Sequence, residues 1–138
     1  MERRNFLKSV AVAGTSATVL TSCTSASGGA GHKLTAGHIV HTVYFWLKEG
    51  ISDTEEKDFL NFFEALKNVP GIHSFNVGKP APTTPRDVVD NSFQYSLIVI
   101  FANLDDIDTY EKHPDHLSAI DKYSKYWTKV AVRDTELL

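Results

Sequence analysis

The chain has 138 residues, which is the usual length of one domain. With 42% hydrophobic and 11% aromatic residues it can form a real core, so a chain that is disordered throughout is excluded. Its net charge is −3 and it has no basic stripe, which argues against a nucleic-acid partner. It has a single cysteine, so an internal disulfide is impossible.

Residues 1–22 are typical of a bacterial export signal. Two adjacent arginines and the following Phe-Leu-Lys resemble the twin-arginine motif. The weakly hydrophobic run at 9–20 is too short and polar to span a membrane, which takes about 20 apolar residues. It ends in Leu-Thr-Ser-Cys, which resembles the lipoprotein box that is cleaved before a lipidated cysteine, here Cys23. An ordinary signal peptide with a chance cysteine is the alternative.

We therefore expect a signal peptide at 1–22, a flexible tether at 23–37 after the lipidated Cys23, and one folded domain at 38–136. The tether is rich in Ser, Thr, Ala and Gly, which cannot bury apolar surface. Stable anchoring takes more than one acyl chain, and the lipoprotein resemblance implies a multiply acylated cysteine. The predicted location is the periplasmic side of a bacterial membrane, which the protein contacts through its lipid.

The predicted domain begins with a strand and a helix. Residues 38–47 alternate and are rich in β-branched and aromatic types, which predicts a strand with large apolar groups on both faces. Ser52 and Glu55 fit a capping box, and Asp53 with Glu56 offers an alternative register. We therefore expect a helix from there to about Asn68, ended by Pro-Gly. The helix stripe expected to pack on the sheet consists of Phe59, Leu60, Phe63 and Leu66.

The second half repeats strands and helices. In chain order we expect a strand at 72–78, a proline-rich loop at 79–91, a strand at 92–102, helices at 104–112 and 114–126, and a strand at 127–134. The order β-α-β-β-α-β predicts an α+β, ferredoxin-like domain with helices on one face of an antiparallel sheet. The other face is left open, and a second copy of the domain is its simplest cover.

Four strings of the domain resemble one known family, the stress-responsive A/B barrel or Dabb family. They lie at 41–48, 70–72, 95–97 and, most specifically, 110–116, which reads Tyr-Glu-Lys-His-Pro-Asp-His. The resemblance implies a homodimer in which two sheets close into a dimeric α+β barrel. It also implies a stress-response role for some members and polyketide cyclase activity for an enzyme member.

The resemblance implies a candidate catalytic pair, Tyr110 and His116, with His41 in the same pocket. The residues agree in part. If Pro114 opens a helix, His116 lies in its first turn, where the helix dipole disfavours imidazolium. A neutral imidazole can act as a general base, and the Tyr110 hydroxyl can donate to a carbonyl oxygen. This pair suits proton removal beside a carbonyl group.

Two classes of function follow for the predicted dimer. One is a small-molecule-binding or stress-response module that encloses a small hydrophobic or aromatic ligand. The other is a cofactor-free enzyme with cyclase-like or isomerase-like chemistry on a carbonyl compound. A polyketide substrate is not expected, because an exported protein has little access to acyl-coenzyme-A intermediates. The residues expected to line the ligand pocket are His41, His113, Tyr44, Trp46, Phe93, Tyr95 and Trp127.

The same residues also allow structural roles. His113 and His116 can cap a broken helix, and Tyr110 can be a core aromatic residue. His113, Asp115 and His116 have the residue types of a metal site. No further ligand is fixed by the sequence, so we expect neither a metal nor a cofactor.

Overall fold

The computed structural model describes residues 33–138, so the predicted signal peptide, Cys23 and most of the tether lie outside the described residues. Within 33–138 no helix has the length and apolar character that a membrane crossing requires. The strands are β1 (Ile39–Leu47), β2 (Ile72–Gly78), β3 (Tyr95–Phe101) and β4 (Trp127–Glu136). The helices are α1 (Asp53–Leu66), α2 (Leu104–Lys112) and α3 (Pro114–Tyr123), followed by a short 3-10 turn, η1 (Ser124–Tyr126).

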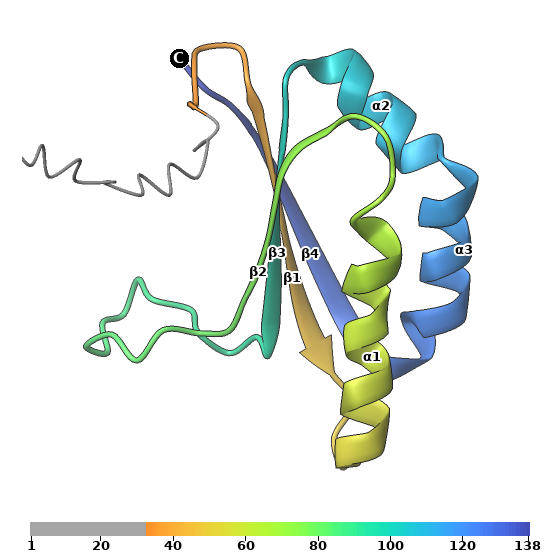
Figure 1. The fold of residues 1–138 in the computed structure, drawn as a ribbon. Coiled ribbons are helices and arrows are strands. Elements are labelled where there is room, and N and C mark those ends of the chain that lie inside the picture. Colours follow the sequence, from red (N-terminus) through yellow and green to blue (C-terminus); the bar gives the residue numbers. More distant parts are fainter. Residues whose placement is uncertain (1–32) are drawn as a thin grey trace, which may run out of the picture. The chain divides into compact units, whose positions relative to one another are not determined.

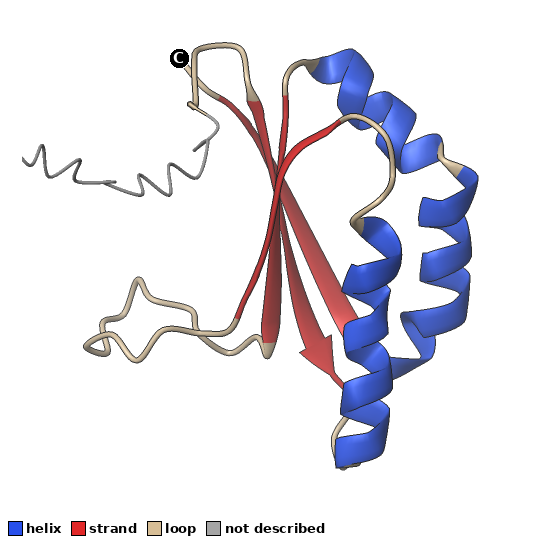
Figure 2. Ribbon diagram, viewed as in Figure 1, coloured by secondary structure: helices blue, strands red, loops and turns tan. Residues whose placement is uncertain are grey.

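The four strands form one antiparallel sheet in the order β2-β3-β1-β4. All three α-helices cover the same face of this sheet, and none of the described helices lies on the other face (Figures 1 and 2). The predicted α+β, ferredoxin-like fold is therefore confirmed. The loop between β2 and β3 projects to the helix-free side of the sheet (Figure 1).

The core lies between the sheet and the helices. Phe45 on β1 is buried, and its ring contacts the rings of Phe59, Phe62 and Phe63 on α1 at 5.6–5.7 Å. The predicted helix stripe was wrong in one residue: Leu60 is 36% exposed, and Phe62 is buried instead. Positions 59, 62, 63 and 66 follow the spacing of three and four residues that places side chains on one helix face.

Local sequence signals set most element boundaries. The predicted capping box at the start of α1 is present, with the Ser52 hydroxyl accepting from the Glu55 N–H and the Glu55 carboxylate from the Ser52 N–H. The strand β3 begins at Tyr95, later than expected, although the Gln94 N–H still donates to the Phe45 carbonyl oxygen on β1 at 2.9 Å. The Gln94 side-chain oxygen accepts from the Leu47 N–H at 2.9 Å. The last helix ends at Tyr123, and its final turn tightens into η1.

Candidate functional site

A pocket of about 410 Å³ opens between the sheet and the helices α2 and α3. Its floor comes from β1 and β4, where Val43 lies opposite Val132 and Phe45 opposite Val130. The walls are mostly apolar, and the polar lining residues are His41, Tyr110, Glu111, His116 and Ser124. Because His41 precedes Phe45 by four residues on β1, about 13 Å of strand separates the two ends of the floor. Trp127 contacts Phe45 at the far end.

Tyr110 lies at the polar end of this pocket. It sits on α2, its side chain is fully buried, and its ring lies 4.6 Å from the ring of His116. The Tyr110 hydroxyl is buried and has no hydrogen-bond partner among the described residues. Burial raises the pKa of Tyr110, with a smaller contribution from the negative charge of Glu111. The phenol therefore stays protonated and has a hydrogen bond to give to a ligand.

The break between α2 and α3 positions His116. Pro114 takes the first helical position of α3, as expected, and brings His116 into the first turn, facing Tyr110. The His116 Nδ1 lies 3.1 Å from the backbone carbonyl oxygen of Glu111. A carbonyl oxygen only accepts, so Nδ1 carries the proton and Nε2 has a free lone pair. Burial lowers the pKa of His116, which favours this neutral form.

His41 forms the third polar group of the pocket. It is 5% exposed, and its Nδ1 lies 2.6 Å from Oδ1 of Asp134, its partner across the β1–β4 ladder. The carboxylate orients the imidazole ring and favours the tautomer with the proton on Nδ1. Sequence reasoning missed Asp134 and Glu111. Only the register of the first and last strands brings Asp134 to His41, and no local motif encodes that register.

His113 has a structural role in α3. Its Nδ1 accepts a hydrogen bond from the Asp115 N–H at 3.2 Å, so it caps the helix, and it does not line the pocket. Its Nδ1 is 3.7 Å from the Asp115 carboxylate. His113, Asp115 and His116 do not form a metal-binding group in the described part of the chain. One group of the described residues has suitable spacing: His41, Glu111 and Asp134, with one ligand atom of each within 4.8 Å of the others.

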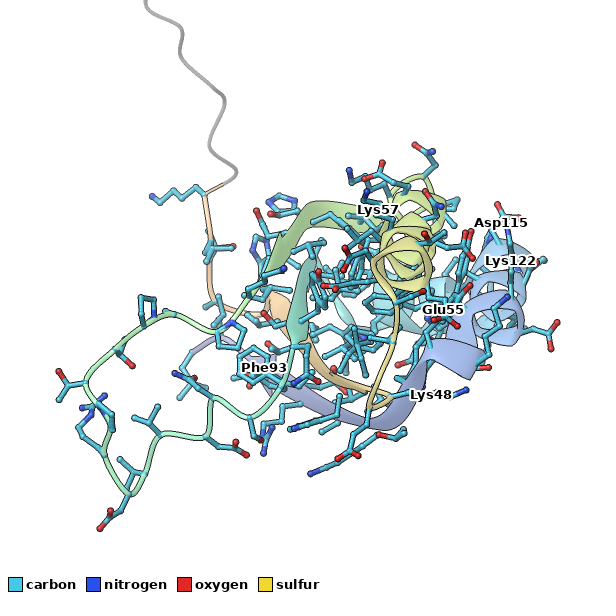
Figure 3. All side chains as sticks on the ribbon, turned by 90° about the horizontal axis from the view of Figure 1, so that it is seen from below. Lys48, Glu55, Lys57, Phe93, Asp115 and Lys122 are labelled. Atoms are coloured by element: carbon cyan, nitrogen blue, oxygen red, sulfur yellow. The ribbon has the colours of Figure 1, made fainter. Side chains whose placement is uncertain are left out.

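The remaining predicted pocket residues lie elsewhere. Tyr44 and Phe93 meet at 4.9 Å on the helix-free side, where the Trp46 indole N–H donates to Ser92 Oγ at 2.9 Å. Figure 3 shows Phe93 on the loop side of the sheet, away from α3 with its labelled Asp115 and Lys122. Tyr95 lies under α1 and donates its hydroxyl to Glu56. Of the seven predicted residues, only His41 and Trp127 therefore line the pocket that contains Tyr110 and His116.

The model of the Stress responsive A/B Barrel Domain family, Dabb, matches residues 39–137. The chain belongs to the Dabb family. A solved Dabb protein with a ferredoxin-like fold from Mesorhizobium loti is 27% identical, with 74% of this chain and 98% of that chain covered and a TM-score of 0.62. A search of curated proteins found no match.

Two further solved structures have a similar fold. A dimeric protein of unknown function from Bacteroides fragilis is 25% identical, with 75% of this chain and 100% of that chain covered and a TM-score of 0.59. A hydroxynitrile lyase from Passiflora edulis is 15% identical, with 75% and 96% covered and a TM-score of 0.63, a likeness of fold alone. The Bacteroides fragilis protein is described as dimeric, which supports the predicted homodimer of this chain.

Proposed function

We propose that this Dabb protein is an enzyme that performs acid–base chemistry on a small hydrophobic carbonyl compound, with His116 as general base and Tyr110 as hydrogen-bond donor. One observation carries the proposal. The rings of the two residues lie 4.6 Å apart in one apolar pocket, and the buried Tyr110 hydroxyl has no partner among the described residues. The Tyr110 hydroxyl can therefore donate a hydrogen bond to a ligand oxygen, and the neutral His116 imidazole beside it can accept a proton from the same ligand.

The proposed reaction starts with the ligand carbonyl oxygen accepting a hydrogen bond from Tyr110. The Nε2 atom of His116 then removes a proton from the carbon next to the carbonyl, and the electron pair moves onto the oxygen as an enolate. Tyr110 stabilises this negative charge. His116 then returns the proton to a different carbon of a conjugated enolate, which gives isomerisation. Alternatively, the enolate carbon attacks a second carbonyl group, and the alkoxide that forms takes the proton from His116, which gives ring closure.

The pocket limits the substrate to a small and largely apolar molecule. A volume of about 410 Å³ lies within the range of ordinary ligand sites, roughly 300–1,000 Å³. Beyond the polar end, the pocket is lined by apolar side chains such as Val43, Leu97 and Trp127. The same apolar lining favours a second candidate function, a binding module that holds such a ligand without converting it.

Hydrogen exchange separates the two candidates. The full chain is incubated in D₂O with a panel of small hydrophobic ketones and β-dicarbonyl compounds, and deuterium entry beside the carbonyl is followed by NMR. We expect catalysed exchange that falls about 10²- to 10⁴-fold in His116→Gln, the usual size of a general-base contribution. Asp121→Asn is the matched control, because Asp121 lies exposed on the same helix outside the pocket. Saturable binding without exchange would favour the binding module, and the absence of both would contradict either function.

We also propose that the protein is exported and anchored by a lipid on Cys23. The support is the sequence pattern of residues 1–23, which lies outside the described residues. In a bacterial host, Cys23→Ala should move the protein from the membrane to the soluble fraction. A variant that stays with the membrane would contradict the lipid anchor.

A further inference from the structure

We propose that His41, Glu111 and Asp134 form a binding site for a divalent transition-metal cation at the polar end of the pocket. The three residues come from β1, α2 and β4, so the fold, and no local motif, assembles them. The proposal does not depend on the reaction proposed above, because it concerns the binding of the metal alone.

The spacing of the ligand atoms suits a metal after small movements. One ligand atom of each residue lies within 4.8 Å of the other two, and His41 Nδ1 is 2.6 Å from Asp134 Oδ1. Metal bonds of about 2.0–2.2 Å place neighbouring ligand atoms roughly 3 Å apart. His41 is buried and fixed on β1, whereas the Asp134 side chain is 48% exposed and Glu111 is exposed. The two carboxylates can therefore adjust around a fixed imidazole.

The charge of this group favours a cation. Two carboxylates face one imidazole at the edge of an apolar pocket. Among residues 33–138 no lysine or arginine forms an ion pair with Glu111 or Asp134. Lys112, the neighbour of Glu111 in the chain, pairs with Asp108 instead. A proton joins His41 Nδ1 and Asp134 Oδ1, and a bound cation would take the place of that proton.

Tyr110 brings a buried hydroxyl to the same end of the pocket. Its side chain is fully buried, its ring lies 6.2 Å from the His41 ring, and its hydroxyl has no partner among the described residues. Three protein ligands leave open coordination positions, as in catalytic metal sites. Water or a ligand oxygen on such a position would give the Tyr110 hydroxyl an acceptor.

The ligand set indicates which ions to use as probes. Ca²⁺ and Mg²⁺ prefer oxygen ligands throughout, whereas an imidazole with two carboxylates suits Zn²⁺ and Mn²⁺. The full chain is freed of metal with a chelator, dialysed, and titrated with Zn²⁺ and with Mn²⁺ by calorimetry. We expect one site per chain, and Zn²⁺ should raise the melting temperature.

Variants of the exposed ligands test the assignment. Glu111→Gln and Asp134→Asn should each weaken binding at least tenfold and abolish the thermal shift. The matched controls, Asp108→Asn on α2 and Glu136→Gln on β4, remove an exposed carboxylate from the same two elements and should bind as the wild type does. The metal-free melting temperatures check that each variant folds. The proposal is overturned if the wild type binds neither ion, or if binding survives unchanged in Glu111→Gln and Asp134→Asn.

Discussion

The Tyr110 hydroxyl lowers the stability of the folded protein as long as no ligand binds to it. The group is buried without a partner among the described residues, and such a group costs about 1–3 kcal/mol. We therefore predict that Tyr110→Phe raises the free energy of unfolding by about 1 kcal/mol, while it lowers the rate of hydrogen exchange in a carbonyl ligand. Urea unfolding gives the first quantity and NMR the second. A Tyr110→Phe protein that is less stable than the wild type would show that the hydroxyl already has a partner.

Residue-scale features differ in how far the sequence predicts them. The string at 110–116 placed Tyr110 and His116 correctly relative to each other, because a helix break at Pro114 is a local event. The sequence did not reveal that Asp134 meets His41, since this contact joins residues 93 positions apart through a strand register. The alternation of the first strand does separate its two faces, with His41 on one and Tyr44 and Trp46 on the other. The prediction that Tyr44 and Trp46 share a pocket with His41 is wrong, because one pocket of this domain lines only one face of that strand.

At the scale of elements, one hydrogen bond connects α1 to η1. The Tyr126 hydroxyl donates to the Asp58 carboxylate at 2.6 Å, and this bond holds the pKa of Asp58 below its ordinary value of 3.8. A lowered pKa in the folded state means that the stabilisation is present above pH 3.8 and is lost as the pH falls through the folded-state pKa. We predict that Tyr126→Phe has a lower melting temperature than the wild type at pH 7. The two melting curves should converge below about pH 3.8, and a difference that persists at pH 2 would contradict this role of Asp58.

Element boundaries followed from the sequence wherever the determining signal was local. The capping box sets the start of α1. The Pro-Gly pair lies directly before β2, and its Gly71 has a φ of +92°, which favours glycine. The stripe of α1 differs from the prediction in one residue, because the spacing from Phe59, Phe63 and Leu66 includes Phe62 and leaves Leu60 at the edge of the stripe. Packing under the sheet therefore selects Phe62.

At the scale of the whole molecule, the helix-free face of the sheet is the surface that a dimer of this chain could use. Ile98 lies on this face of the central strand β3 and is 38% exposed, beside Thr42 on β1 and Asn76 on β2. The similar Bacteroides fragilis protein is described as dimeric, and a domain of about 100 residues gains stability from further burial. We propose that two copies of this chain meet through this face.

Ile98→Lys is therefore predicted to convert the dimer into a monomer, because a lysine ammonium in a sheet-to-sheet interface loses its hydration without gaining a partner. Leu60→Lys is the matched control, since Leu60 is 36% exposed but lies on α1, on the opposite side of the sheet. Light scattering at micromolar concentration should give a dimer for the wild type and for Leu60→Lys, and a monomer for Ile98→Lys. A wild-type monomer would refute the assembly itself. A dimer of Ile98→Lys would instead show that the interface lies on another surface. The comparison with Leu60→Lys is fair, because the two substitutions add the same charge at nearly equal exposure.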